Sequence, residues 1–279
     1  MVTTIGVYVS KGGTGKSTLA ALLAVDLAER GQRVALVDLD RQGTQCDIFD
    51  LYDEQGRVET LHQVLKRRVA APAALRPVAG EWRGDLFVLP GGALTPLAVE
   101  EIKLNPARFG ILNTLDIVRG PVQDLGALVE YVVLDMGPSD QVLSIAGLLA
   151  MDYLLIPIEP NRSSIERLDY VLQEVESVRS VHDVRIAGIV QNKVHLYFGG
   201  LRASQSVRMA RDVLDQQYAD LLLVDAKGNR VEIPFDQDWE VVRWSGEYQL
   251  TRATYIKDPV KQAARRFLNA VWHAIGGDE

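Results

Sequence analysis

A glycine-rich segment near the start of the chain constrains the fold more than any other feature. Residues 11–18 read KGGTGKST, after an apolar run at 4–10 and before a segment with helical spacing at 17–30. A loop of the pattern GxxxxGK[ST] between a strand and a helix is typical of a phosphate-binding loop, and here the match begins at Ser10, as SKGGTGKS. A glycine-rich turn without a ligand is the alternative, but the strand–loop–helix context favours a phosphate site.

The residue types in this loop suit a phosphate ligand. Glycines let the backbone turn tightly, so that its N–H groups can point at phosphate oxygens, and the helix N-terminus adds a favourable partial charge. Lys16 is placed to pair with β- and γ-phosphates, the hydroxyl of Ser17 to bind Mg²⁺, and Thr18 to donate to an inner phosphate. The residues predicted to bind the nucleotide here are Gly12, Gly13, Thr14, Gly15, Lys16, Ser17 and Thr18.

Further apolar runs rich in β-branched residues alternate with helical segments such as 165–181. Near-continuous apolar strands between helices indicate a mostly parallel sheet covered on both faces. The sequence therefore predicts an α/β, doubly wound fold. The other predicted strands are 33–38, 85–89, 131–135, 152–158 and 184–191.

Composition sets the remaining limits. With 279 residues, of which 47% are hydrophobic and 24% charged, we expect one globular domain over 1–279, with a helical insertion around 52–84. Cys46 is the only cysteine, which excludes an internal disulfide and any metal site built from several cysteines of one chain. The net charge of −7 decides little, because a local basic face can still bind nucleic acid. Neither a secretory signal nor a membrane span is expected, and a cytoplasmic location fits.

Lys11 is a second lysine inside the loop. With it, the segment resembles the deviant Walker A group of P-loop ATPases that contains ParA, MinD and the nitrogenase iron protein, whose pattern is KGGxGK[ST][ST]. The resemblance implies Mg²⁺-dependent ATP hydrolysis. It also implies a homodimer closed by ATP, in which Lys11 reaches the partner's nucleotide. As the alternative, Lys11 is a solvated loop charge.

A second motif, VALVDLDRQGTQ at 34–45, is similar to the VDxDPQGN-type segment of ParA-like proteins, with Arg41 in place of the proline and Thr44 in place of the asparagine. The resemblance implies that Asp40 orients or activates the attacking water, and that Asp38 lies near Mg²⁺. Gln42 is expected to frame this switch loop. Two aspartates in an exposed turn are the alternative.

A third motif, YVVLDMGPS at 131–139, ends a predicted strand with Asp135. By resemblance this is the Walker B residue, which binds Mg²⁺ through water, and Gly137 could present an N–H group to the γ-phosphate. The usual family sequence is nearer DxPPS, so this turn departs from the pattern. A strand-ending aspartate that caps the next helix is the alternative.

Two later segments are candidates for binding the base of the nucleotide. GIVQNK at 188–193 resembles the family segment whose asparagine contacts adenine, which assigns that role to Asn192. VEIPFD at 231–236 resembles the segment that packs near the purine, with Pro234 and Phe235 as candidates. The guanine signal NKxD is lacking, since residues 192–195 read Asn-Lys-Val-His, and ATP is favoured.

Within the deviant Walker A group, the surface residues and the number of cysteines distinguish one function from another. A single cysteine excludes the cluster of the iron protein, and a terminal tyrosine cluster of the bacterial kinases is lacking. ParA-like members bind DNA without sequence preference, and a ParB-like partner stimulates their hydrolysis; the resemblance implies a nucleoid-associated protein. The candidates for the DNA face are Arg202, Arg208 and Arg211 in a predicted helical stretch, followed by Arg243, Arg252 and Lys257. Scattered charges on a solvated face are the alternative.

The segment 259–275 has apolar residues at helical spacing. It could lie on a membrane as the terminal helix of MinD does, or pack its apolar face on the sheet, which is the favoured reading. We expect a positioning ATPase of the ParA kind, without a helix-turn-helix domain before Lys11. A MinD-like membrane regulator and a metabolic or assembly ATPase of the same fold are the alternatives.

Overall fold

The computed structural model describes residues 2–138, 141–197, 202–236, 239 and 257–277. Its centre is an eight-stranded sheet. Neighbouring strands run parallel, except for the pair formed by the strand at 76–77 and the one at 85–89. In spatial order the strands are β12 (Glu232–Pro234), β9 (Arg185–Val194), β8 (Tyr153–Ile158), β1 (Thr3–Val7), β7 (Tyr131–Asp135), β2 (Arg33–Asp38), β6 (Asp85–Leu89) and β5 (Arg76–Pro77).

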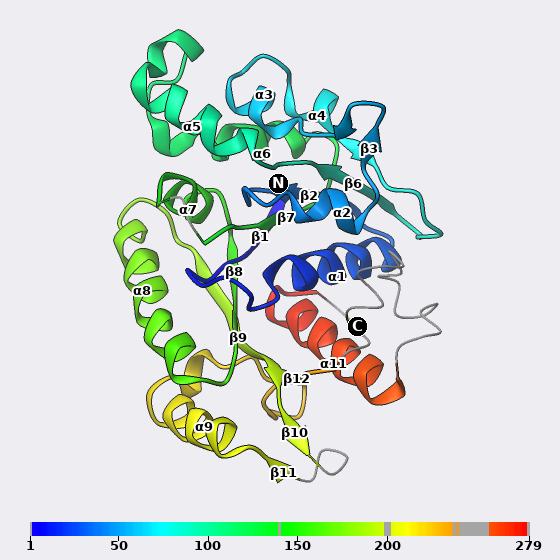
Figure 1. Ribbon diagram of the computed structural model, residues 1–279, viewed down its shortest axis with the longest axis vertical. Coiled ribbons are helices and arrows are strands. Elements are labelled where there is room, and N and C mark those ends of the chain that lie inside the picture. Colours follow the sequence, from blue (N-terminus) through cyan, green and yellow to red (C-terminus); the bar gives the residue numbers. More distant parts are fainter. Residues whose placement is uncertain (1, 139–140, 198–201, 237–238, 240–256, 278–279) are drawn as a thin grey trace.

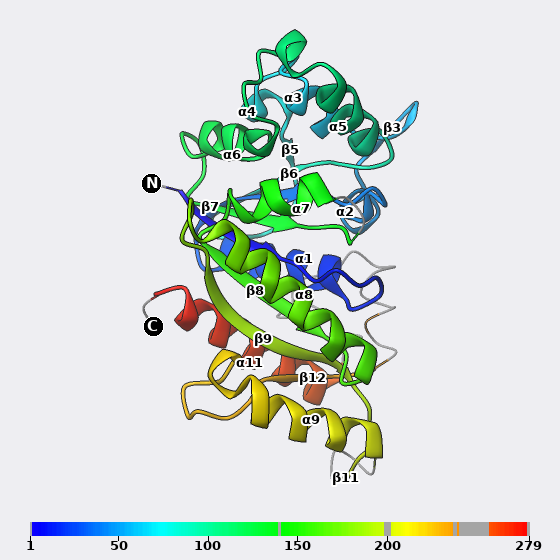
Figure 2. The ribbon, with the colours of Figure 1, turned by 90° about the vertical axis from the view of Figure 1, so that its left-hand side faces the viewer.

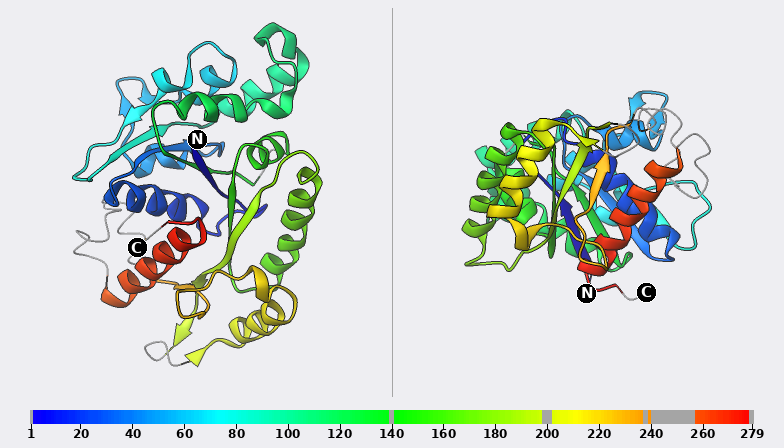
Figure 3. Two further views of the ribbon diagram at one scale, coloured as in Figure 1. Left: turned by 180° about the vertical axis from the view of Figure 1, so that it is seen from behind. Right: turned by 90° about the horizontal axis from the view of Figure 1, so that it is seen from below.

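Helices cover both faces of this sheet, as Figure 3 shows in the view from below. The side chains of β2 alternate: Val34 and Leu36 join the cluster under α1 and α11, whereas Ala35 and Val37 join the cluster on the opposite face. The predicted doubly wound α/β fold is confirmed. The helices are α1 (Lys16–Glu29) and α11 (Asp258–Ala274) on one face, and α7 (Gln141–Leu148), α8 (Arg162–Val178) and α9 (Gln205–Gln217) on the other.

Smaller elements lie at the two ends of the sheet (Figure 1). The β6 end carries α3 (Leu61–Leu65), α4 (Ala71–Ala74), α5 (Leu94–Leu104), α6 (Arg119–Leu125) and the 3-10 turns η1 (Pro106–Phe109) and η2 (Thr114–Asp116). Also near β2 and β6 are α2 (Thr44–Ile48) and the hairpin of β3 (Tyr52–Asp53) with β4 (Gly56–Arg57), whereas the β12 end carries the hairpin of β10 (Leu196–Tyr197) with β11 (Arg202–Ala203) and η3 (Ala219–Leu221). Residues 52–84 thus contain two short helices, a hairpin and β5.

The three predicted motifs meet at one edge of the sheet. Register pairs Asp135 with Val7 on one side and with Asp38 on the other, so that β1, β7 and β2 end level with one another. The loop that begins after Val7 therefore lies beside both aspartates. This edge is where α/β sheets bind their ligands.

The C-terminal helix α11 packs on the sheet. Its apolar residues Phe267 and Val271 are fully buried, in the same cluster as residues of α1 and β12. The face that could have lain on a membrane is thus covered by protein. In the part of the chain that the structure describes, no helix is both long and apolar enough to cross a bilayer.

Candidate nucleotide-binding site

The loop between β1 and α1 has the backbone that its glycines predict. Gly13 and Gly15 take φ values of +79° and +87°, a left-handed conformation that favours glycine. A side chain at Gly12 or Gly13 would meet no atom within 4 Å, so the loop borders open space. Gly15 is the N-cap of α1, and no side chain caps its first N–H groups. These N–H groups remain available to an anion.

Lys16 lies under this open space. It is buried, and its Nζ donates to the carbonyl of Lys11 at 2.7 Å. Burial lowers the pKa of Lys16, while the charges of Asp135 and Asp40 raise it. A cavity of about 430 Å³ opens above the loop. It is lined by Gly12, Gly13, Gly15, Lys16, Ser17 and Thr18, and by residues of four other segments, among them Asp40, Pro138, Asn192, Phe235 and Trp239.

Asp38 and Asp135 form a fully buried acidic pair. Burial raises the pKa of Asp135 to about 6, although hydrogen bonds from Gln45 and Ser17 lower it. Burial and the neighbouring Asp135 also raise the pKa of Asp38. Asp135 accepts from Gln45 Nε2 at 2.7 Å through Oδ2, while its buried Oδ1 has no partner among the described residues. A cation at this point would satisfy the free oxygen and remove the charge penalty.

The site fits Mg²⁺ better than a metal held by protein alone. Within the described ranges, no three His, Cys, Asp or Glu side chains gather closely enough to hold an ion. Mg²⁺ is usually held by one or two carboxylates together with water and substrate phosphates. Asp135 and Ser17 suit that mode. Both oxygens of Asp38 already accept backbone N–H groups, from Asp40 and Gln45 at 3.0 Å each.

Asp40 joins the second and third motifs. It is buried, and its Oδ1 accepts the N–H of Gln42 at 3.0 Å. A side chain at Gly137 would meet Asp40 Cγ at 3.0 Å, so the turn after β7 lies directly against this carboxylate. Asp40 also lines the cavity above the loop. The structure therefore brings Asp40, Lys16 and Ser17 around one space.

Lys11 points away from that space. Its Nζ donates to Asn161 Oδ1 at 3.1 Å, to Ser163 Oγ at 2.8 Å and to Ser164 Oγ at 3.0 Å, at the start of α8. Glu159 lies 4.0 Å from the same nitrogen. Lys11 is thus held by its own chain beside the site, while its carbonyl receives Lys16.

The residues predicted to contact the adenine base differ in how they lie relative to the cavity. Asn192 donates from Nδ2 to the carbonyl of Thr14 at 2.8 Å, and thereby braces the phosphate loop. Pro234 does not line the cavity, whereas the neighbouring Phe235 does. The Phe235 ring is half-exposed and stacks on His195, with 4.7 Å between ring centroids. Phe235 is the better placed of the two candidates to contact a base.

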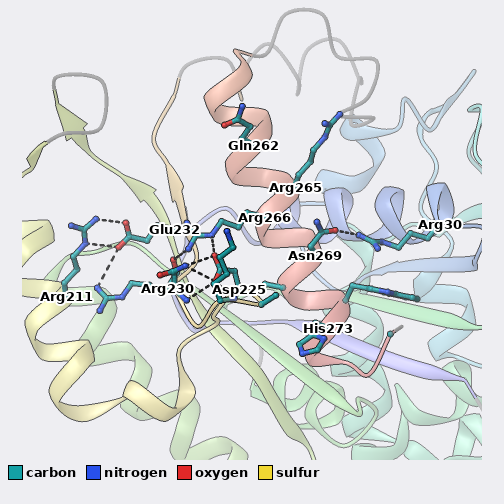
Figure 4. Close-up of a pocket in the computed structure, with 16 residues that line it drawn as sticks. Arg30, Arg211, Asp225, Arg230, Glu232, Gln262, Arg265, Arg266, Asn269 and His273 are labelled. Atoms are coloured by element: carbon teal, nitrogen blue, oxygen red, sulfur yellow. Dashed lines mark hydrogen bonds and ion pairs between the residues drawn. The ribbon is translucent and has the colours of Figure 1, made fainter. Parts of the chain in front are cut away.

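The basic residues predicted for DNA do not form one described face. Arg202 belongs to β11, so its predicted place in a helix was wrong: that helix, α9, starts only at Gln205, where Ser204 caps it. Arg208 is exposed on α9, whereas Arg211 forms a two-fold ion pair with Glu232 at 2.8 and 2.5 Å (Figure 4). Lys257 pairs with Asp236. Arg243 and Arg252 lie outside the described residues.

Arg211 borders a wide cavity of about 1110 Å³ beside α11. Two carboxylates, Asp225 and Glu232, line it and pair with the guanidinium groups of Arg266 and Arg211. In the described ranges, Arg265 and Lys227 have no ion pair there. The cationic side chains that line this cavity are Arg30, Arg211, Lys227, Arg230, Arg265 and Arg266.

Sequence reasoning missed Gln45, which is fully buried at the centre of the site. Its Nε2 bonds Asp135 and, at 3.1 Å, the carbonyl of Ser17, while its N–H bonds Asp38. It thus ties three predicted segments together. Gln45 is the last residue of the second motif, VALVDLDRQGTQ. A polar side chain so soon after Asp40 was the one signal in the sequence that it belongs to the site.

Comparisons with known proteins agree with this geometry. The model of the AAA_31 family, described as an AAA domain, matches residues 2–187. The chromosome partitioning protein ParA of Caulobacter vibrioides is 31% identical over 208 residues, which cover 73% of this chain and 72% of that protein. Protein IncC of Escherichia coli is 28% identical over 192 residues, 68% of this chain; the match spans 50% of the length of IncC.

Solved structures show the same fold. Cyanothece McdA in complex with ATP has a TM-score of 0.81 at 19% identity, with 100% of this chain and 98% of that chain covered. MinD of Pyrococcus horikoshii complexed with Mg-ADP has a TM-score of 0.66 at 19% identity, with 98% and 96% covered. Together with the extent of the family match, the phosphate loop and the two aspartate motifs at one sheet edge show that the chain belongs to the ParA/MinD family of P-loop ATPases.

Proposed function

We propose that the protein is a Mg²⁺-dependent ATPase that dimerises on ATP and positions a cargo along DNA. One observation carries the catalytic part: the uncapped, glycine-lined start of α1 faces Asp40, beside a buried carboxylate with an unsatisfied oxygen. An anion and a cation together complete such a site. Solved relatives with this fold include complexes with ATP and with Mg-ADP.

The residues divide the work as follows. The N–H groups of the loop and Lys16 hold the phosphates, and Asn192 keeps the loop in shape through the carbonyl of Thr14. Ser17 and Asp135 hold Mg²⁺, which offsets phosphate charge when it is bound. Asp38 organises the switch loop through its two N–H acceptor bonds and adds negative charge beside the metal. Asp40 orients or activates the attacking water.

The position of Lys11 supports the proposal of a dimer. The side chain leaves its own loop and lies at the edge of the site, on the start of α8. From there it can exchange these polar partners for the phosphates of a second copy. Because each active site then depends on its partner, turnover by the single chain is slow.

For cargo, we propose non-specific duplex DNA as the track and a ParB-like adaptor as the activator. The most similar curated relatives include partitioning proteins, and Arg208 and Arg265 offer exposed cations in the described part of the chain. Such a protein acts at the nucleoid. The MinD-like alternative is less supported, because the apolar face of α11 is buried on the sheet.

The test uses Asp40→Ala with ATP and Mg²⁺, mixed with random-sequence duplex DNA or with anionic liposomes across a salt series. We expect DNA binding that requires ATP and weakens steeply with salt. Arg208→Ala should weaken it, whereas Arg162→Ala, which removes an exposed arginine on α8, should not. Liposome binding that is lost on deleting residues 259–279 would favour the membrane alternative, and binding to neither would contradict the DNA proposal.

A further inference from the structure

Arg57 lies at the junction between the β3–β4 hairpin and the switch loop that carries Asp40. Its Nη1 donates to the carbonyl of Gln42 at 2.7 Å, and its Nη2 donates to Asp47 Oδ2 at 2.6 Å. Asp47 lies in the helix that follows the switch loop, and its other oxygen accepts the hydroxyl of Tyr52 at 2.5 Å. One guanidinium therefore fastens both ends of the segment from Gln42 to Asp47.

The Gln42 backbone connects this contact to Asp40. Its N–H donates to Asp40 Oδ1 while its carbonyl accepts from Arg57. These two groups belong to successive peptide planes that meet at Gln42 Cα, so the two bonds together restrain φ and ψ of Gln42 and fix the loop between the hairpin and the carboxylate. One oxygen of Asp40 is thereby engaged by the loop, which determines where the other oxygen points.

The loop is confined on its far side as well. Gly43 has a φ of +61°, and a side chain there would meet the carbonyl of Gly91 and the Cα of Gly92, each at 3.1 Å. Arg57 Nη1 lies 3.5 Å from the same point. The switch loop thus passes between the turn after β6 and the guanidinium of Arg57, and a larger residue at Gly43 would be strained and tightly packed there.

We propose that Arg57 is a positioning residue for ATP hydrolysis, which orients Asp40 through the backbone of Gln42. The inference rests on the proposed function, and it assigns a catalytic contribution to a hairpin within residues 52–84, the segment that the motifs leave without a role. Arg57 does not line the nucleotide cavity. Its removal should therefore affect turnover and leave nucleotide binding unchanged.

The test compares steady-state ATP turnover and nucleotide affinity in Arg57→Ala and Arg57→Lys. Because misplacing a catalytic group slows chemistry by up to about 100-fold, we expect kcat of Arg57→Ala to fall by about 10-fold, with KM within about 2-fold of the wild type. A lysine can keep one of the two bonds, so Arg57→Lys should recover part of the rate. The matched control is Arg33→Ala, which removes a surface ion pair with Glu130 and should change neither value.

A double-mutant comparison separates positioning from a merely structural role. In an Asp40→Ala background, Arg57→Ala should slow the residual hydrolysis no further, because its effect passes through Asp40. Tyr52→Phe, which removes only the hydroxyl on Asp47, should have a smaller effect than Arg57→Ala and should keep the fold.

The outcomes are distinct for the two proposals. If Asp40→Ala hydrolyses ATP far more slowly than the wild type, while Arg57→Ala matches the wild type, only the Arg57 inference fails. Equal fractional losses from Arg57→Ala with and without Asp40 also overturn it. If the wild type neither binds nor hydrolyses ATP, the proposed function fails, and the inference with it.

Discussion

Single residues at the strand ends determine the chemistry of this site. Asp135 is fully buried, with one oxygen bonded to Gln45 and the other without a hydrogen-bond partner among the described residues, and Asp38 lies level with it on the next strand. Their positions after two apolar runs could be predicted from sequence. The role of Gln45 could not, because it depends on side-chain contacts with Asp135, 90 residues later, and with Ser17.

The pKa of Asp135 leads to a prediction about stability. This pKa is raised from 3.8 to about 6 in the folded protein. The folded state is therefore stabilised because it binds this proton more tightly than the unfolded chain does. The stabilisation is fully present below about pH 4 and is lost as the pH rises through about 6. Asn mimics the protonated form. Without Mg²⁺ and nucleotide, Asp135→Asn should raise the free energy of unfolding at pH 7.5 by roughly 1–3 kcal/mol.

Urea denaturation between pH 5 and 8 measures this difference. The advantage of Asp135→Asn should shrink toward pH 5, and the exposed Asp85→Asn should show no such trend. A stabilisation that is the same at every pH, or a destabilisation at pH 7.5, would contradict the account of the buried charge.

Lys16 and Asp40 should separate binding from hydrolysis. Lys16→Ala removes the buried cation under the phosphate loop, and fluorescent ATP should then fail to bind. Asp40→Ala leaves that cation in place, so ATP should bind with near wild-type affinity but be cleaved much more slowly. Normal hydrolysis by Asp40→Ala would show that another group handles the water.

At the scale of elements, apolar periodicity predicted much of the sheet. The runs at 33–38, 85–89 and 131–135 are strands with those bounds. Helix boundaries that are set by side-chain caps were harder to predict. Helix α8 begins at Arg162 rather than at 165, because Asn161 caps it by accepting the N–H of Ser164. Arg202 falls in a two-residue strand that forms a short hairpin with β10, which no periodicity reveals.

The packing of α11 gives a prediction at this scale. Phe267 is fully buried between the helix and the sheet, so Phe267→Ala should lower the free energy of unfolding by about 3–5 kcal/mol. Gln262, exposed on the same helix, is the control, and Gln262→Ala should change stability by less than about 0.5 kcal/mol. An equally small change for Phe267→Ala, with weaker liposome binding, would show that the helix serves a membrane.

At the scale of the whole molecule, the structure shows one half of a proposed sandwich. Lys11 rests on Asn161, Ser163 and Ser164, residues some 150 positions away that the phosphate motif alone could not indicate. Lys11→Ala should bind ATP and remain monomeric, because the cross-interface contact is lost. Lys227→Ala, which removes an exposed cation that lines the other cavity, should dimerise as the wild type does.

The central claim, an ATP-switched dimer, is tested most directly by the mass of Asp40→Ala in solution. Light scattering with Mg²⁺ and ADP should give the monomer mass of 30.8 kDa, and Mg²⁺ with ATP should give twice that value. The doubling should vanish when Lys11→Ala is added. A mass that is the same with either nucleotide would contradict the account.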